Sequence, residues 1–216
     1  MPIIWVTGDT HGDWIHRVNM DSFPEQREMS KDDYVIILGD FGIWRDSPQQ
    51  RWYLNWLEEK HFTTLFIDGN HENYDILDSY PVEEWHGGKV HFIKPSIIHL
   101  MRGQVFDIDG LKFFTFGGAA SHDISDGVLE IDDPRVKEWR DDPDKMYRIN
   151  HISWWEREMP NQEEMDEGIK NLAEHNNKVD FILTHCTASS TAALLSHGLY
   201  LSLIHISEPT RHSLIS

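Results

Sequence analysis

The chain has 216 residues, of which 39% are hydrophobic and 12% aromatic, so it is long and apolar enough to form one domain with a substantial core. Its formal net charge of −18 argues against non-specific binding to nucleic acid, which depends on a basic surface. No apolar run has the length that a membrane-crossing helix requires.

The cysteine content and the N-terminus both bear on the cellular compartment. A single cysteine, Cys186, excludes an internal disulfide framework and favours a reducing environment. Met1 leads directly into an apolar segment, without the basic stretch and apolar core of a secretion signal. We therefore expect a cytoplasmic protein that does not associate with a membrane.

The first half of the chain alternates between apolar β-type runs and short helical patterns. Ser47 is a suitable N-cap and Pro48 suits a first helical turn, so a helix is expected after the second run. Trp52 and Trp56 have helical spacing within it and are expected in the core. The sequence predicts strands at 3–8, 34–39 and 63–68, with short helices at 13–20 and 72–79.

The second half is richer in strands. Closely spaced apolar runs lie between residues 91 and 116, and the Asp109-Gly110 step between two of them predicts a hairpin. The acidic stretch 126–144 reads as a solvated surface excursion. Asn161 and Glu164 then form a capping-box pattern for a helix, and a strand follows at 179–185. This order predicts one α/β domain with a β-rich second half.

Polar side chains follow each of four apolar runs directly. Since ligands gather beyond the carboxyl ends of strands in layered α/β folds, these side chains are expected at one edge of a sheet. They are Asp9 and His11, Asp40, Asn70 and His71, and His185. Taken alone, an aspartate after glycine could be a turn residue or helix cap, and a histidine at a strand end could be a core residue.

Together these side chains form a metal-ligand set. Asp9 and His11 lie two residues apart and point the same way in an extended segment. Asp40 has two oxygens and could bridge two ions, which would then clamp a phosphate between them. Mixed oxygen and nitrogen ligands suit Mn, Fe, Zn or similar divalent ions. His71, beside Asn70, could donate a proton to a leaving oxygen.

These motifs carry a family resemblance. The order Gly8-Asp9-Thr10-His11, Gly39-Asp40, Gly69-Asn70-His71-Glu72 and Thr184-His185 resembles the calcineurin-like metallophosphoesterases over most of residues 1–200. The stretches "FFTFGGAASHD" and "YRINHISWWERE" are similar to a bacterial and phage-type branch.

The resemblance implies a four-layer α/β/β/α sandwich and two divalent metal ions that generate a metal-bound hydroxide as nucleophile. It implies that Asp9, His11 and Asp40 bind one ion, that Asp40, Asn70 and His185 bind the other, and that His71 is the catalytic histidine.

The sequence departs from the family pattern in two places. The stretch "GDFGIW" lacks the second aspartate and the Arg-Gly pair that often follow the family's Gly-Asp motif. After His185 there is no Gly-His-x-His motif, which supplies further metal ligands in the family. Residues 201–216 instead resemble a translated sequencing adaptor. We therefore hypothesise that 1–200 is a phosphoesterase domain lacking its last strands, with impaired activity, and that 201–216 is a non-native tail.

The substrate class stays open at this point. A phosphatase or a phosphodiesterase acting on a phosphorylated small molecule, a nucleotide or a phosphoprotein would fit, whereas the acidic charge disfavours long nucleic acid. Arg148 could bind substrate phosphate, and an ordinary surface salt bridge is the alternative. A non-catalytic phosphate- or partner-binding module on the same fold is the alternative function.

Overall fold

The structure is a computed structural model that describes residues 1–187, 191 and 194. All the elements below belong to one compact unit, Met1–His185. The hypothesis about residues 201–216 concerns a segment outside the described residues.

The first sheet has six strands in the order β1-β2-β3-β6-β5-β4. The strands β1, β2, β3 and β6 run parallel, and β5 and β4 continue the sheet antiparallel. Gly8 pairs with Leu38, and Leu38 pairs with Ile67, so the first three strands end in step. The strands are β1 (Ile4–Gly8), β2 (Tyr34–Leu38), β3 (Thr63–Ile67), β4 (Val82–Trp85), β5 (Gly88–Lys94) and β6 (Ile97–Leu100).

The second sheet has three strands in the order β11-β8-β7, with β7 (Gln104–Ile108), β8 (Leu111–Phe116) and β11 (Phe181–Thr184). Asp109 and Gly110 turn the chain from β7 to β8 with φ values of 54° and 84°. Two consecutive positive φ values match a two-residue hairpin loop, which confirms the predicted hairpin. Strand β11 lies parallel to β8.

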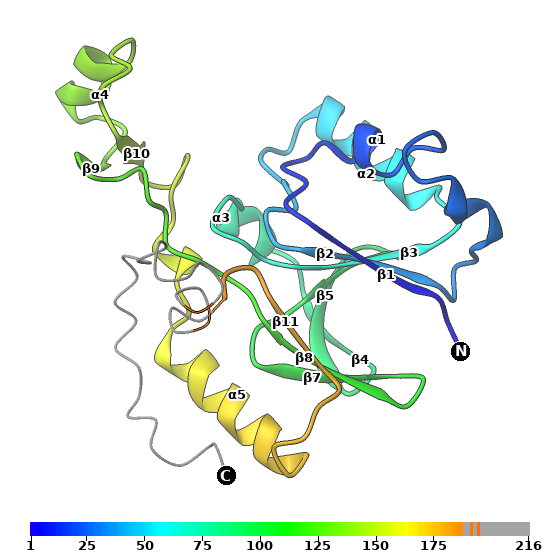
Figure 1. The fold of residues 1–216 in the computed structure, drawn as a ribbon. Helices are drawn as coiled ribbons and strands as arrows, with labels where there is room; N and C mark the ends of the chain where they lie inside the picture. The colour runs from blue at the N-terminus through cyan, green and yellow to red at the C-terminus, as the bar shows by residue number, and fades with distance from the viewer. Residues whose placement is uncertain (188–190, 192–193, 195–216) are drawn as a thin grey trace. The chain divides into compact units, whose positions relative to one another are not determined.

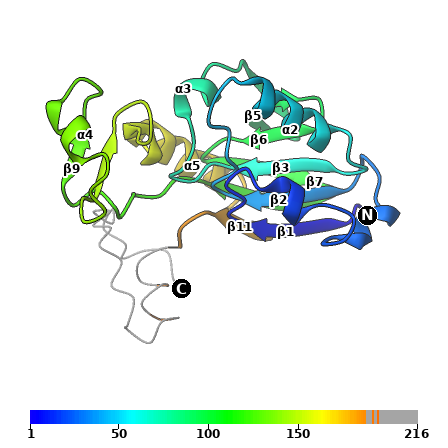
Figure 2. The ribbon, with the colours of Figure 1, turned by 90° about the horizontal axis from the view of Figure 1, so that it is seen from above.

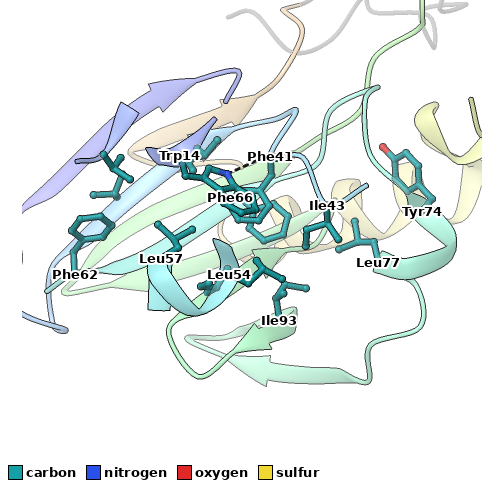
Figure 3. Close-up of a cluster of buried hydrophobic side chains, with 14 of the residues drawn as sticks. Trp14, Phe41, Ile43, Leu54, Leu57, Phe62, Phe66, Tyr74, Leu77 and Ile93 are labelled. Carbon is teal, nitrogen blue, oxygen red and sulfur yellow. Dashed lines mark hydrogen bonds between the residues drawn. The ribbon is translucent and has the colours of Figure 1, made fainter. Parts of the chain in front are cut away.

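Helices cover one face of the first sheet. They are α1 (Trp14–Arg17), α2 (Pro48–Glu58) and α3 (Tyr74–Leu77), with a 3₁₀ turn at Pro24–Glu28. Leu54 and Leu57 of α2 pack with Phe66 of β3 in a buried apolar cluster, shown in Figure 3. The indole Nε1 of Trp14 donates to the Phe41 carbonyl at 3.0 Å across this cluster. The loop that carries Asp40 is thereby fixed to the core.

The other face of the first sheet packs on the second sheet. Ile36 and Leu65 of the first sheet share a buried cluster with Phe113 and Leu183 of the second. Helix α5 (Gln162–Glu174) covers the outer face of the second sheet, where Gly168 lies against Phe114. Figures 1 and 2 show the resulting order of helices, sheet, sheet and helix. The α/β fold with more than one sheet, expected from the sequence, is confirmed.

The local helix signals at Ser47 and Asn161 are also confirmed. The Ser47 hydroxyl accepts from the Gln50 amide, and Asn161 and Glu164 form a complete capping box. The prediction for the α2 tryptophans was wrong at Trp52, which is 56% exposed, because Leu54 and Leu57 occupy the inward face.

Other segments differ from the sequence prediction in extent. Helix α1 stops at Arg17 because the Asn19 side chain donates to the Ile15 carbonyl at 2.8 Å and accepts from the amides of Asp21 and Ser22. The acidic stretch 126–144 contains β9 (Gly127–Leu129) and α4 (Pro134–Trp139). Strand β10 (Tyr147–Ile149) and a 3₁₀ turn at Glu156–Glu158 follow it. In the described part of the chain, no helix is both long and apolar enough to cross a membrane.

Candidate metal centre

Two loops at the carboxyl edge of the first sheet bring together side chains that could hold a metal ion. Asp9 and His11 follow β1, and Asp40 follows β2. One ligand atom from each of these residues lies within 4.8 Å of the others. Asp40 is buried, whereas Asp9 and His11 are exposed, so the cluster is open to solvent on one side. An ion held here would remain accessible to a substrate.

The Asp40 carboxylate lies between two imidazoles. Its Oδ2 is 3.4 Å from His11 Nε2, and its Oδ1 is 3.5 Å from His185 Nε2. Each carboxylate oxygen therefore faces a different histidine. This is the arrangement of a carboxylate that can bridge two ions.

His185 reaches this position from the end of β11, in the second sheet, so the expectation that all four clusters lie at the edge of one sheet was wrong for this residue. Its Nδ1 is 2.8 Å from the Leu38 carbonyl, which can only accept, so Nδ1 carries the proton. Nε2 is then left as a lone-pair donor, and it lies 3.3 Å from Asn70 Oδ1. Histidine ligands of metals commonly have the other ring nitrogen fixed in this way. The donors present therefore fit a divalent ion next to Asp40, Asn70 and His185.

The backbone at the centre is strained and tightly packed. His11 and Asp40 have φ values of 46° and 48°, in the left-handed region that few residues other than glycine adopt. A Cβ at Gly39 would lie 2.2 Å from His185 Nδ1, and one at Gly69 would lie 2.1 Å from Asp40 Oδ1. Gly39 and Gly69 are needed because no side chain fits at these two positions, whereas a Cβ at Gly8 would meet no atom within 4 Å.

His71 lies beside the ligand cluster. Its ring centroid is 5.3 Å from that of His11, and its backbone amide donates to Asp40 Oδ1 at 2.8 Å. Arg148 Nη1 is 3.4 Å from His71 Nδ1. Burial, together with the positive charges of Arg148 and His11, lowers the pKa of His71, and the Asp40 carboxylate opposes this shift. The imidazole is therefore neutral near pH 7.

Arg148 lies in β10, and its guanidinium is held by Asp123 and Ser153. It forms a bidentate pair with Asp123, with Nε–Oδ1 at 3.0 Å and Nη2–Oδ2 at 2.6 Å, and it donates to the Ser153 carbonyl at 3.2 Å. The salt bridge considered from the sequence therefore exists, and the same guanidinium also faces His71. Both readings of Arg148 remain compatible with this geometry.

Glu72 has a structural part in the site that the sequence motif did not specify. Its buried carboxylate accepts from the Phe41 amide at 2.6 Å and from the Gly42 amide at 3.2 Å. Burial raises the pKa of Glu72 to about 8, against the effect of these two bonds. Glu72 thereby ties the Asn70–His71 loop to the loop that carries Asp40.

A second link, through Ser121 and Glu158, fixes the Asn70 side chain. Ser121 Oγ accepts from Asn70 Nδ2 at 3.3 Å, and the Ser121 amide and hydroxyl both donate to the Glu158 carboxylate at 2.8 Å. Ser121 and Glu158 are 6% and 2% exposed. With Nδ2 held by serine, the Asn70 Oδ1 points toward His185. Nothing in the spacing of these residues indicates the contact.

Below the site, Asp68 anchors the start of the Asn70–His71 loop. Arg102 Nε donates to Asp68 Oδ2 at 2.7 Å, and His99 Nε2 lies 3.2 Å from Asp68 Oδ1. Burial raises the pKa of Asp68, but the charge of Arg102 and the bond from His99 outweigh it and hold the pKa well below its usual range. The Asp68 carbonyl accepts from Gly118, so both sheets are joined at this point.

The comparison with known families decides the identity. The family model for calcineurin-like phosphoesterases matches residues 3–192. The chain belongs to the calcineurin-like phosphoesterase family. The match covers all the metal-ligating residues expected from this phosphoesterase's sequence, together with His71 and Arg148. Neither a curated protein nor a solved structure matches the chain. Family membership indicates metal-dependent phosphoester hydrolysis, and the cluster of Asp9, His11 and Asp40 offers this phosphoesterase a metal site.

Proposed function

We propose that this chain is a phosphoester hydrolase that works with two divalent metal ions. The observation that carries the proposal is the Asp40 carboxylate, whose two oxygens lie 3.4 Å from His11 Nε2 and 3.5 Å from His185 Nε2. A carboxylate with an imidazole on each side fits two ions that share it. With a single ion beside Asp40, either His11 or His185 would have no metal to coordinate.

Asp9, His11 and Asp40 would hold one ion, and Asp40, Asn70 and His185 the other. When bound, such ions supply Lewis acidity for the phosphoryl oxygens and a water nucleophile near neutral pH. The mixed oxygen and nitrogen ligands make Mn²⁺ a suitable first ion to test, with Fe and Zn as alternatives. The ligands from the first sheet are fixed by Glu72 and Asp68 before an ion arrives.

His71 would act on the leaving group. Arg148 Nη1 can only donate, so His71 Nδ1 accepts and the ring proton lies on Nε2. A neutral imidazole with Nε2–H can donate this proton to the oxygen of the departing alcohol. We also propose that Arg148 contacts a phosphoryl oxygen of the substrate. Because Asp123 already holds the Arg148 guanidinium, the side chain loses little conformational entropy when the substrate binds.

The substrate that we propose is a phosphorylated small molecule, a nucleotide or a phosphoprotein, as a monoester or a diester. The net charge of −18 disfavours a long polyanion. The single cysteine, Cys186, favours a reducing compartment such as the cytoplasm.

Replacing His71 with alanine tests the mechanism. With the protein loaded with Mn²⁺, p-nitrophenyl phosphate and bis-p-nitrophenyl phosphate measure monoesterase and diesterase activity. We expect His71→Ala to lower kcat by about 10²–10⁴-fold, because it removes a proton donor, with the metal content unchanged. Metal content is measured by elemental analysis of the same samples.

His61→Ala is the matched control, because His61 is exposed in the loop before β3. It should leave both kcat and metal content unchanged. Equal kcat in wild type and His71→Ala would remove His71 from the mechanism. A fully loaded wild type that binds phosphate but hydrolyses neither ester would instead support a non-catalytic binding module.

A further inference from the structure

A hollow of about 390 Å³ adjoins the candidate metal centre. This volume lies within the range of roughly 300–1,000 Å³ that is typical of small-molecule sites. Its walls come from the loop after β1, the loop after β2 and the start of α2. They include His11, Trp44, Arg45, Gln49, Gln50 and Tyr53. His11 therefore belongs both to the ligand cluster and to the wall of the hollow.

Trp44 lies close to both reacting parts of the site. Its ring centroid is 6.5 Å from that of His11 and 6.3 Å from that of His71. A phosphoryl group at the ligand cluster would direct its leaving oxygen toward His71. The atoms that follow this oxygen then come within reach of the indole. Trp44 is thus a wall for the leaving group rather than for the phosphate.

The backbone at Trp44 is held by two hydrogen bonds. Its amide donates to Gln50 Oε1 at 3.3 Å, and its carbonyl accepts from Asn73 Nδ2 at 3.0 Å. Asn73 is itself held as the N-cap of α3, where it accepts from the Ile76 amide. The loop that presents the Trp44 indole to the hollow is therefore anchored at this residue.

The other walls offer hydrogen bonds and a positive charge. Tyr53 presents a second aromatic ring, and its hydroxyl accepts from Gln49 Nε2 at 3.1 Å. The amides of Gln49 and Gln50 can both donate and accept. Arg45 adds a positively charged guanidinium to the residues that line the hollow. Aromatic rings and amide groups in the same walls suit a planar heteroaromatic ring, which can stack on a ring and form hydrogen bonds with amide atoms, whereas an alkyl chain could use the rings alone.

We propose that this hollow binds the base of a nucleoside monophosphate while its phosphate lies at the metal centre. The proposal rests on the proposed hydrolase function and names its substrate class. Trp44 is the residue that determines specificity, through stacking of the base on its indole. The small size of such a nucleotide also agrees with the net charge of −18, which disfavours longer polyanions.

AMP and ribose 5-phosphate provide the test, because they share the reacting phosphoester and differ in the base. With the Mn²⁺-loaded wild type, kcat/KM should be higher for AMP. Trp44→Ala should lower kcat/KM for AMP by about 5- to 150-fold, the range expected for loss of one base–aromatic stack, and should leave ribose 5-phosphate unchanged. Trp44→Phe, which keeps a ring, should retain most of the preference.

Trp52→Ala is the matched control, since Trp52 is an exposed tryptophan of α2 that does not line the hollow. It should alter neither substrate. Circular dichroism of each variant reports on folding. Equal losses for both substrates in Trp44→Ala, or a wild type without preference for AMP, would overturn the proposal.

A binding measurement separates this proposal from the proposed function. Calorimetric titration of AMP and of ribose 5-phosphate is carried out on Mn²⁺-loaded His71→Ala, with and without Trp44→Ala. Tighter binding of AMP that depends on Trp44 supports the base site even when the wild type hydrolyses neither compound. Equal affinity for the two compounds overturns the base site even when hydrolysis is observed.

Discussion

Single side chains outside the proposed metal-ligand set orient the side chains that we propose as ligands. Asn70 is an example, because an amide can present either its oxygen or its nitrogen to an ion. Ser121 Oγ accepts from Nδ2 and so selects the oxygen, while Glu158 keeps the serine in place. Outer groups of this kind commonly change metal affinity by about 10- to 100-fold when they are removed.

Ser121→Ala should therefore weaken metal binding without removing a ligand. We expect the affinity for Mn²⁺ to fall by about 10-fold, because the Asn70 amide is then free to rotate. Calorimetric titration of the metal-free protein measures this change. Ser96→Ala is the control, since Ser96 is also buried but accepts from Lys31 at the opposite end of the parallel strands. Unchanged affinity in Ser121→Ala would show that Asn70 is oriented by other contacts.

The buried histidine pair shows how single residues can also set pH dependence. His91 Nδ1 lies 3.1 Å from His99 Nδ1, and His99 Nε2 faces Asp68. Burial lowers the pKa of His91 to about 4, with a smaller contribution from the charge of His99. Arg157 adds to this shift, whereas Asp78 and Asp68 oppose it.

The native pKa of His91 lies below the value of about 6.5 for the unfolded chain, so acid favours unfolding. Between pH 6.5 and 4, His91 is protonated in the unfolded state but stays neutral in the native state. For metal-free protein, we expect His91 to account for about 1–2 kcal/mol of the stability lost between pH 7.5 and pH 5.

Urea unfolding at the two pH values measures this loss. His91→Asn, which can still donate to His99, should lose less stability than the wild type on acidification. His61→Asn, at an exposed position, should behave as the wild type does. Identical losses for wild type and His91→Asn would assign the pH dependence to other groups.

At the scale of elements, the site depends on loops that are tied to one another. The loop after β3 holds the loop after β2 through Glu72, which accepts from the Phe41 and Gly42 amides. Asp40 directly precedes these two residues and has a left-handed φ of 48°. A strained ligand residue keeps such a conformation only when its surroundings impose it.

Glu72→Gln should loosen this connection while preserving the shape of the side chain. One of the two amides would face the NH₂ group instead of an oxygen, so a buried donor would lose its acceptor. We expect a loss of about 1–3 kcal/mol in stability and weaker Mn²⁺ binding. Chemical denaturation and metal titration check the two effects. Glu83→Gln, on the exposed face of β4, is the control, and a variant equal to wild type in both measurements would contradict this role.

For the whole molecule, the sequence predicts much of the fold because its local signals agree with its global pattern. The apolar runs that end in Gly-Asp or Gly-Asn become strands of one sheet, and the caps at Ser47 and Asn161 form as expected. The contacts of Ser121 and Trp44 could not be predicted, because they join segments whose proximity depends on tertiary packing. Asn70 and Ser121 are 51 positions apart, and no periodicity relates them.

The origin of His185 has a mechanical consequence. Asp9, Asp40 and Asn70 follow strands of the first sheet, but His185 follows β11 of the second, two residues after Leu183 in the core between the sheets. An ion bound by ligands from the first sheet and by His185 from the second would link the two sheets across that core. Its binding free energy would then stabilise their packing against relative displacement. Conversely, a cavity made by Leu183→Ala in the core would change the position of His185 relative to the proposed ligands of the first sheet.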